Sequence, residues 1–144
     1  MNDDDFDKFV EELQKEIIQK ELEVFNEKIV EIFHNPKNWG KMEGEDIISE
    51  AYRGPCGDLM EFYLKIKDGI IEKATFITDG CGASVAAGSQ TTILIEGKDI
   101  EYAKNLKPED IDKALNGLPE DHKHCAELCV RTLRKVLKKY NQKQ

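Results

Sequence analysis

The 144-residue sequence has no uninterrupted apolar run near the length of about 20 residues that a membrane-spanning helix requires. Its acidic start, Asp3-Asp4-Asp5, is unlike a signal peptide, which begins with basic residues. Internal repeats and low-complexity stretches are also missing. With 40% hydrophobic and 35% charged residues, the chain suits one soluble domain with a single core, and we expect a cytoplasmic protein without a membrane segment.

The chain has no excess of positive charge, since 29 acidic residues outnumber 21 basic ones and the formal net charge is −8. This balance argues against nucleic acid as a partner, because phosphate binding needs clustered cations. Basic residues gather only near the end of the chain. We interpret them as the solvated face of a helix, with a docking face for an acidic protein as the alternative; they are Arg131, Arg134, Lys135, Lys138 and Lys139.

The four cysteines form no Cys-x-x-Cys pair, and the spacing of a zinc finger is absent. In a reducing compartment, cysteines serve more often as ligands or reactive thiols than as a disulfide framework. Local spacing therefore does not by itself identify a metal site, and the folding of the chain has to bring the thiols together.

A helical periodicity covers residues 4–33 and changes phase once. Apolar residues follow four-three-four spacing from Phe6 to Ile17 and restart one residue out of phase at Ile18. Two helical segments, or one helix with a broad buried face, would fit this pattern. Asn35-Pro36 then ends the helical region.

We expect residues 1–33 to form an N-terminal helical extension and residues 34–144 to form the globular domain. The apolar stripe of the extension has two possible partners, the domain itself or another chain. We favour the first, so that the extension folds back on the domain.

Residues 59–67 and 70–79 alternate between apolar and polar side chains, as half-buried strands do. Asp68-Gly69 between them is typical of a two-residue type I′ turn, which predicts a hairpin with a fixed register. Lys65 then faces Glu72, and Phe62 faces Thr75.

Extended past the strands, the same register places Cys56 opposite Cys81 on the apolar face. Asp58 shares that face, because side chains two positions apart in a strand point the same way. A bulge near Gly57 or Gly80 would shift this match by one residue.

A weaker strand is expected over residues 46–53, and the remainder reads as helix. The predicted helices cover 83–96, a short segment capped by Asp99, a segment from Pro108 to Gly117, and a last helix that begins near Asp121. The last helix carries an apolar stripe of Cys125, Leu128, Cys129, Thr132, Val136 and Tyr140. This order predicts an α+β fold, a small antiparallel three-stranded sheet with helices packed on one face and an N-terminal helical extension.

Candidate metal ligands occur in three segments. Cys56 and Asp58 lie in a glycine-flanked loop, Cys81 lies between glycines just before a helix, and His124-Cys125 starts the last helix. A helix start favours thiolate, which predicts a lowered pKa for Cys81 and Cys125. The alternatives are a tight turn with a buried cysteine at Cys56 and an Asp58 carboxylate bonded to backbone amides.

Other chemically active side chains receive structural interpretations. Cys129 is expected in the core, because free cysteine packs as a small hydrophobe. His34 and His122 are expected at the surface or as capping residues, with His122 the more plausible entrant to the site. Trp39 is expected to pack over the exit of the N-terminal helix.

Several segments resemble the scaffold proteins of iron-sulfur cluster assembly, the IscU type that also forms the N-terminal part of NifU. The resemblance covers about residues 30 to 140. It rests on the segments His34-Asn35-Pro36-Lys37-Asn38-Trp39-Gly40, Cys56-Gly57-Asp58, Gly80-Cys81-Gly82-Ala83-Ser84 and His124-Cys125.

The resemblance implies that Cys56, Cys81 and Cys125 bind a nascent two-iron, two-sulfur cluster, with Asp58 or His124 as fourth ligand. It also implies that Cys125 accepts persulfide sulfur from a cysteine desulfurase and that the empty scaffold can hold zinc. The protein would then be a scaffold rather than an enzyme, supplied by an electron donor protein and emptied by cluster acceptor or carrier proteins.

Two departures from the family pattern matter, the segment before His124 and a helix before about residue 25 that is longer than the resemblance accounts for. Many members carry Leu-Pro-Pro-Val-Lys for a specialised Hsp70 chaperone, whereas this chain has Leu118-Pro119-Glu120-Asp121-His122, which argues against dedicated Hsp70 handoff. The interval from Cys81 to Cys125 lacks the long insertion of the related SufU proteins, so the IscU type is the closer match.

Two competing classes use the same residues. A zinc-binding domain with a structural or sulfur-relay role would hold zinc with these ligands. A thiol enzyme would pair Cys125 with His124, although neighbouring residues on a helix point about 100° apart, which is poor geometry for a base beside its nucleophile.

Overall fold

The computed structural model describes residues 2–143 and confirms the α+β class. Its elements, in chain order, are α1 (Asp3–Leu22), α2 (Glu27–His34), β1 (Ile47–Arg53), β2 (Leu59–Lys67), β3 (Ile70–Thr78), α3 (Gly82–Ile95), α4 (Ile100–Lys104), α5 (Pro108–Ala114), the 3₁₀ turn η1 (Glu120–His122) and α6 (His124–Lys143). The three predicted strands and the predicted helices after them are all present. The last helix begins at His124, after the 3₁₀ turn, rather than near Asp121.

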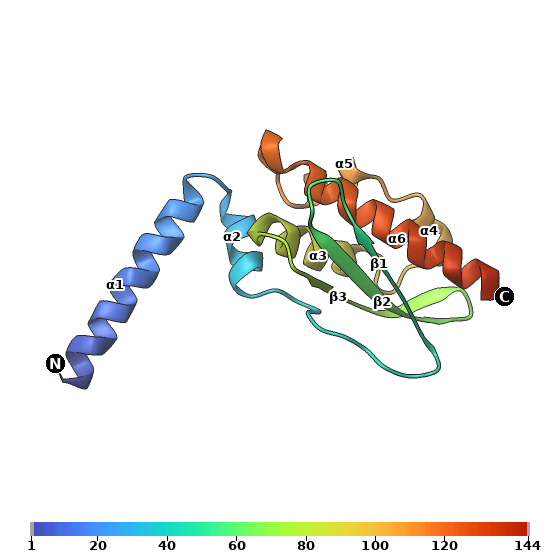
Figure 1. Cartoon of the computed structure of the whole chain (residues 1–144), viewed down its shortest axis with the longest axis horizontal. Helices are drawn as coiled ribbons and strands as arrows, with labels where there is room; N and C mark the ends of the chain where they lie inside the picture. Colours follow the sequence, from blue (N-terminus) through green and yellow to red (C-terminus); the bar gives the residue numbers. More distant parts are fainter. Residues whose placement is uncertain (1, 144) are drawn as a thin grey trace.

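The sheet is antiparallel in the order β1-β2-β3, and α3 and α6 lie side by side on one of its faces (Figure 1). Helix α6 packs mainly on β1, and α3 packs on β3. This is the predicted three-stranded sheet with helices on one face. This arrangement places the first turns of α3 and α6 near the loop that joins β1 to β2.

The hairpin turn has the predicted geometry, with positive φ at Asp68 and Gly69. Lys67 pairs with Ile70 as predicted, but a register shift between Lys65 and Ile66 pairs Lys65 with Lys73 and Phe62 with Phe76. The predicted partners Glu72 and Thr75 were therefore wrong. The turn fixes only the first pairs, and the irregularity places the apolar ring of Phe76, rather than Thr75, opposite Phe62.

The core lies between the sheet and the two long helices. The predicted stripe of α6 is buried from Cys125 to Val136 and half-buried at Tyr140. Helix α3 approaches the sheet closely because its inner face carries small residues. A Cβ added at Gly88 would lie 2.5 Å from a ring carbon of Phe76, so only glycine fits there.

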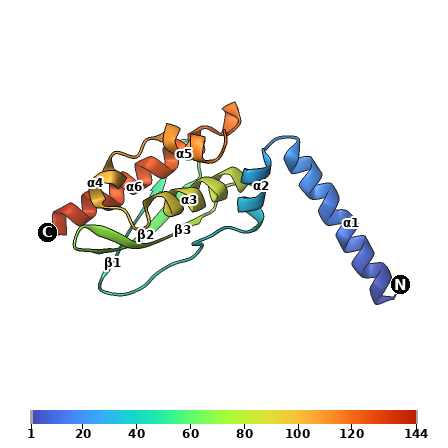
Figure 2. The same ribbon diagram turned by 180° about the vertical axis from the view of Figure 1, so that it is seen from behind.

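The N-terminal region forms two helices, but α1 does not fold back on the domain as expected. None of its residues 3–22 is buried, and the helix projects away from the body in both views (Figures 1 and 2). Helix α2 instead packs against α3 and buries Ile29 and Val30. The apolar site beside α3 is thus filled by α2, and the chain reverses before Asn26, so α1 has no core surface left to cover.

Trp39 also lies elsewhere than expected. It stands edge-on to the ring of Phe76, with 5.2 Å between ring centroids, and its backbone bridges to β3. Trp39 therefore packs beside the edge strand β3 and does not cover the N-terminal helix. Half of its surface is exposed.

Candidate metal centre

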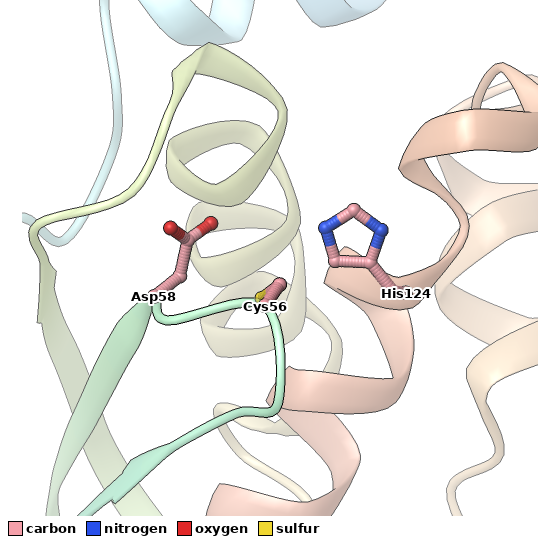
Figure 3. A group of neighbouring side chains, drawn as sticks. All are labelled: Cys56, Asp58 and His124. Carbon is pink, nitrogen blue, oxygen red and sulfur yellow. The ribbon is translucent and has the colours of Figure 1, made fainter.

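Side chains from the β1–β2 loop and from the start of α6 meet at one end of the sheet. One ligand atom from each of Cys56, Asp58 and His124 lies within 4.8 Å of the other two. Figure 3 shows Cys56 and Asp58 on the loop and His124 approaching from the facing helix. A sulfur, a carboxylate oxygen and an imidazole nitrogen are thus close enough to share one metal ion.

The loop that carries Cys56 is held by its own backbone and by α6. Gly54 N–H donates to the Asp58 carbonyl, and Gly57 N–H donates to the Gly54 carbonyl, both at 2.9 Å. Gly57 adopts a φ of +94°, which favours glycine. A Cβ on Gly54 would lie 3.2 Å from Leu128, so this glycine lets the loop sit directly on α6.

Asp58 does not take the backbone-capping role that was its alternative. That role belongs to Asp79, whose Oδ1 accepts from Leu59 N–H at 2.7 Å and whose pKa this hydrogen bond lowers. The Asp58 Oδ2 atom instead accepts from the Ser84 hydroxyl at 3.1 Å. The Asp58 carboxylate therefore points to the site and not to the strand end.

Ser84 was not assigned a role from the sequence, although it stands inside a recognised segment. Its buried hydroxyl lies 3.4 Å from Cys125 Sγ and 4.0 Å from Cys81 Sγ, besides its bond to Asp58. A Cβ on Gly80 would lie 2.6 Å from this hydroxyl, so that glycine is needed for the close approach. Its position one helical turn after Cys81 is the signal that could have identified it.

Cys81 is the N-cap residue of α3 and is exposed. A hydrogen bond from the Cys125 thiol, followed by backbone N–H groups of Ser84 and Ala83, lowers the pKa of Cys81 to about 5. The predicted lowering of the Cys81 pKa is therefore confirmed, but its largest cause is the Cys125 thiol and not the helix start.

Cys125 has the opposite character. Its side chain is fully buried, and the hydrogen bond to Cys81, together with burial, raises the pKa of Cys125 above the ordinary value of a thiol. The prediction of a low pKa for Cys125 was wrong. The first turn of α6 faces the core, and the neighbouring thiol already carries the negative charge that the two cysteines share.

All five predicted ligands lie in one neighbourhood, but not by the predicted strand pairing. Because β2 starts at Leu59 and β3 ends at Thr78, Cys56 and Cys81 lie beyond the paired residues. Ser84 joins Asp58 to both Cys81 and Cys125, and His124 Nε2 lies 3.8 Å from Cys125 Sγ. The His124 imidazole therefore approaches the Cys125 thiol, although neighbouring residues on a helix were expected to point apart.

The remaining candidates lie outside this group. Cys129 is fully buried, and burial raises its pKa to about 12, which confirms a core role. His122 packs edge-on to the ring of Phe25 and contacts Asp121, with 3.0 Å from Nδ1 to the carboxylate. His34 pairs with Glu21 at 2.9 Å on the surface.

A small cavity of about 120 Å³ opens beside Cys56 and His124. Across it, Arg131 donates to Glu127 at 2.9 Å, so the two charges meet each other rather than the thiol. The cavity gives this side of the centre access to solvent. Its lining residues are Tyr52, Gly54, Pro55, Cys56, His124, Glu127, Leu128 and Arg131.

The donor set suits a soft metal ion. Thiolate and imidazole favour zinc and iron-sulfur clusters, whereas magnesium and calcium prefer all-oxygen sites. A carboxylate among these ligands adds one weaker donor.

Within residues 2–143, no helix combines the length and apolar character needed to cross a membrane.

Comparison with curated proteins gives named relatives over most of the chain. The iron-sulfur cluster assembly scaffold protein IscU 1 of Archaeoglobus fulgidus is 38% identical over 83% of this chain and 78% of its own length. IscU of Escherichia coli K12 is 34% identical over 83% of this chain and 96% of its own length. The nitrogen fixation protein NifU of Azotobacter chroococcum is 33% identical, and the match spans 38% of that longer protein.

Solved structures support the fold. The N-terminal part of a NifU-like protein from Brucella abortus matches with a TM-score of 0.62 at 17% identity, over 85% of this chain and 98% of that one. A putative SUF-system scaffold from Fervidobacterium islandicum matches with a TM-score of 0.59 over 81% of this chain and 98% of its own. The family model described as the NifU-like N terminal domain matches residues 24–144, and the chain therefore belongs to this family.

Proposed function

We propose that this protein is a scaffold on which a two-iron, two-sulfur cluster is built and from which it is passed to other proteins. One observation carries the proposal. The Cys56 thiol, the Asp58 carboxylate and the His124 imidazole lie within 4.8 Å of one another. They stand beside the hydrogen-bonded thiols of Cys81 and Cys125. The relatives named as iron-sulfur scaffolds support the same role.

Cys56, Cys81 and Cys125 are the proposed sulfur ligands of the cluster, which is the cargo of the scaffold. Asp58 is the proposed fourth ligand, with His124 as the alternative. A carboxylate binds iron more weakly than a thiolate does. One weaker ligand would let the site hold a cluster and still release it, while exposed Cys56 and Cys81 leave the cargo open to a recipient.

Sulfur would arrive as a persulfide on a cysteine desulfurase, with Cys125 as the acceptor. The Cys125 thiolate attacks the outer sulfur, the sulfur–sulfur bond breaks, and the desulfurase cysteine leaves as thiolate. In the metal-free protein Cys125 holds its proton and bonds to Cys81. Iron bound by Cys81 would occupy that acceptor, so we propose that Cys125 receives sulfur after iron has bound.

The proposed partners are therefore a cysteine desulfurase, an electron donor protein and cluster acceptors, in the cytoplasm. The same ligands could hold zinc in the empty scaffold. Leu118-Pro119-Glu120 lacks the second proline of the chaperone-read peptide, so no dedicated Hsp70 handoff is proposed.

Anaerobic reconstitution with iron, cysteine and a desulfurase tests the proposal. The expected result is visible-region absorption of a two-iron, two-sulfur cluster that an acceptor apoprotein then removes. Retained zinc with no cluster absorption would instead support the alternative, a zinc-binding domain with a structural or sulfur-relay role.

Asp58→Ala should lengthen the lifetime of the bound cluster, because it removes the weaker ligand. The measurement is the rate of cluster transfer to an acceptor, followed by absorption. Asp79→Asn is the matched control, since Asp79 serves the Leu59 amide and not the site. An unchanged or shortened lifetime in Asp58→Ala would count against this ligand.

Cys125→Ser should abolish persulfide on the scaffold while the fold stays intact. Mass spectrometry after incubation with iron, desulfurase and cysteine measures the added sulfur, and Cys129→Ala is the buried-thiol control. Persulfide that persists in Cys125→Ser would move the acceptor role to Cys56 or Cys81.

A further inference from the structure

Exposed apolar side chains concentrate on the N-terminal helix. Of the eleven large hydrophobic residues that are exposed in the described part of the chain, seven lie between residues 6 and 24. Monomeric proteins rarely leave such a patch in water. The seven are Phe6, Phe9, Leu13, Ile17, Ile18, Leu22 and Val24.

Helix α1 also lacks a packing partner of its own. It is capped by Asn2 and tied at its end by the Glu21–His34 pair, but none of its residues 3–22 is buried. In proteins, most helices gain their stability from packing one apolar face against a partner rather than from helix propensity. A surface that covers this face would therefore stabilise α1.

The face has the pattern of a short coiled-coil seam. Its residues are alternately three and four positions apart, the spacing at which one helix packs along another. Four apolar side chains stand in the middle, and opposite charges stand at the two ends. In order, they are Asp3, Phe6, Val10, Leu13, Ile17 and Lys20.

This order is complementary to itself when a second copy runs in the opposite direction. Phe6 of one copy then faces Ile17 of the other, and Val10 faces Leu13. At both ends, Asp3 of one copy faces Lys20 of the other. A two-fold axis between Glu11 and Glu12 relates the halves, as a self-complementary dimer requires.

The parallel alternative is disfavoured by charge. It would place Asp3 against its own equivalent and bring together the two N-terminal halves, which are strongly acidic. Like charges brought together in this way repel, whereas the antiparallel arrangement places the acidic half beside the half that ends in Lys20. The acidic residues concerned are Asp3, Asp4, Asp5, Asp7, Glu11 and Glu12.

We propose that α1 pairs with α1 of a second copy as an antiparallel two-stranded coil. The seam from Asp3 to Lys20 is about 25 Å long, from the rise of about 1.5 Å per residue. Because α1 projects from the body (Figures 1 and 2), the two domains lie at opposite ends of the coil, and each metal centre stays open. The proposal does not depend on the cluster chemistry.

Sedimentation of the full metal-free chain over a range of concentrations tests the pairing. The wild-type chain is expected to dimerise, and Leu13→Glu is expected to stay monomeric, because it places a charge in the centre of the seam. Lys15→Glu, on the outer side of the same helix, is the matched control and should dimerise as the wild type does. A monomeric wild-type chain, or a dimer that survives Leu13→Glu, would overturn the proposal.

Charge exchange tests the direction. Asp3→Lys and Lys20→Asp should each weaken dimerisation by about tenfold, and the double variant should restore it, because exchanged pairs meet at both ends. A double variant weaker than both single variants would exclude the antiparallel register. Monomeric Leu13→Glu should bind zinc as the wild type does, because the seam lies outside the metal centre. If the scaffold function proves wrong, the sedimentation result is unaffected, so the two proposals can fail separately.

Discussion

Cys81 and Cys125 both stand at the start of a long helix, yet they carry opposite protonation states. Cys81 is exposed, and its pKa is lowered to about 5 by the Cys125 thiol and by backbone N–H groups. Cys125 is buried and its pKa is raised. A helix start therefore does not decide the state of a thiol; access to water and the sharing of one charge decide it.

The largest expected effect is on reactivity with an alkylating reagent. At pH 7 and without metal, Cys81 is a thiolate and Cys125 is a buried thiol, so Cys81 should label on the order of 100-fold faster. Peptide mass spectrometry at timed intervals measures both rates in one sample, and fully buried Cys129 serves as the internal control. Faster labelling of Cys125 would contradict the opposite protonation states of the two thiols.

Ser84→Ala should slow the labelling of the two thiols unequally, with a smaller effect. Its hydroxyl lowers the pKa of both thiols, and Cys125 receives the closer contact, 3.4 Å against 4.0 Å for Cys81. Loss of a hydrogen bond worth about 1 kcal/mol should slow labelling of Cys125 by roughly fivefold and that of Cys81 less. Ser84→Thr, which keeps a hydroxyl, should restore the wild-type rates, whereas equal slowing of both thiols would contradict this assignment.

The effect on the pH dependence of stability should be weaker still, because water screens the charge of exposed Cys81. The pKa of Cys81 is about 5 in the folded chain, against an ordinary value of 9.0 for the thiol in the unfolded chain. The contribution of this thiolate to the free energy of unfolding therefore grows as pH rises from 5 to 9. It is lost as pH falls through 5. Urea unfolding of metal-free protein at several pH values measures this. The difference between wild type and Cys81→Ser should increase over that range, and a constant difference would show that no such thiolate forms.

Much of the fold followed from local sequence. Asp68-Gly69 predicted the hairpin, Asp99 and Pro108 predicted helix starts, and the stripe from Cys125 to Val136 predicted the buried face of the last helix. Each signal acts within a few residues, through backbone angles, capping or side-chain period. The site residues came from the same kind of signal, supported by the family resemblance.

Predictions that depended on contacts between distant segments fared less well. The shift near Ile66 changed the register, because packing of Phe76 outweighed the extrapolation from the turn. The stripe of α1 was real, but α2 took the core position that α1 was expected to fill. The boundary after residue 33 stays a prediction.

Residue chemistry and local periodicity are properties of the chain, so the candidate metal ligands and the elements that carry them could be predicted before folding was considered. The lowered pKa of Cys81, the raised pKa of Cys125 and the contacts of Ser84 with both thiols and Asp58 follow from the folded arrangement alone. The reason is physical. Burial, hydrogen bonding and the sharing of charge depend on neighbours that chain order does not specify.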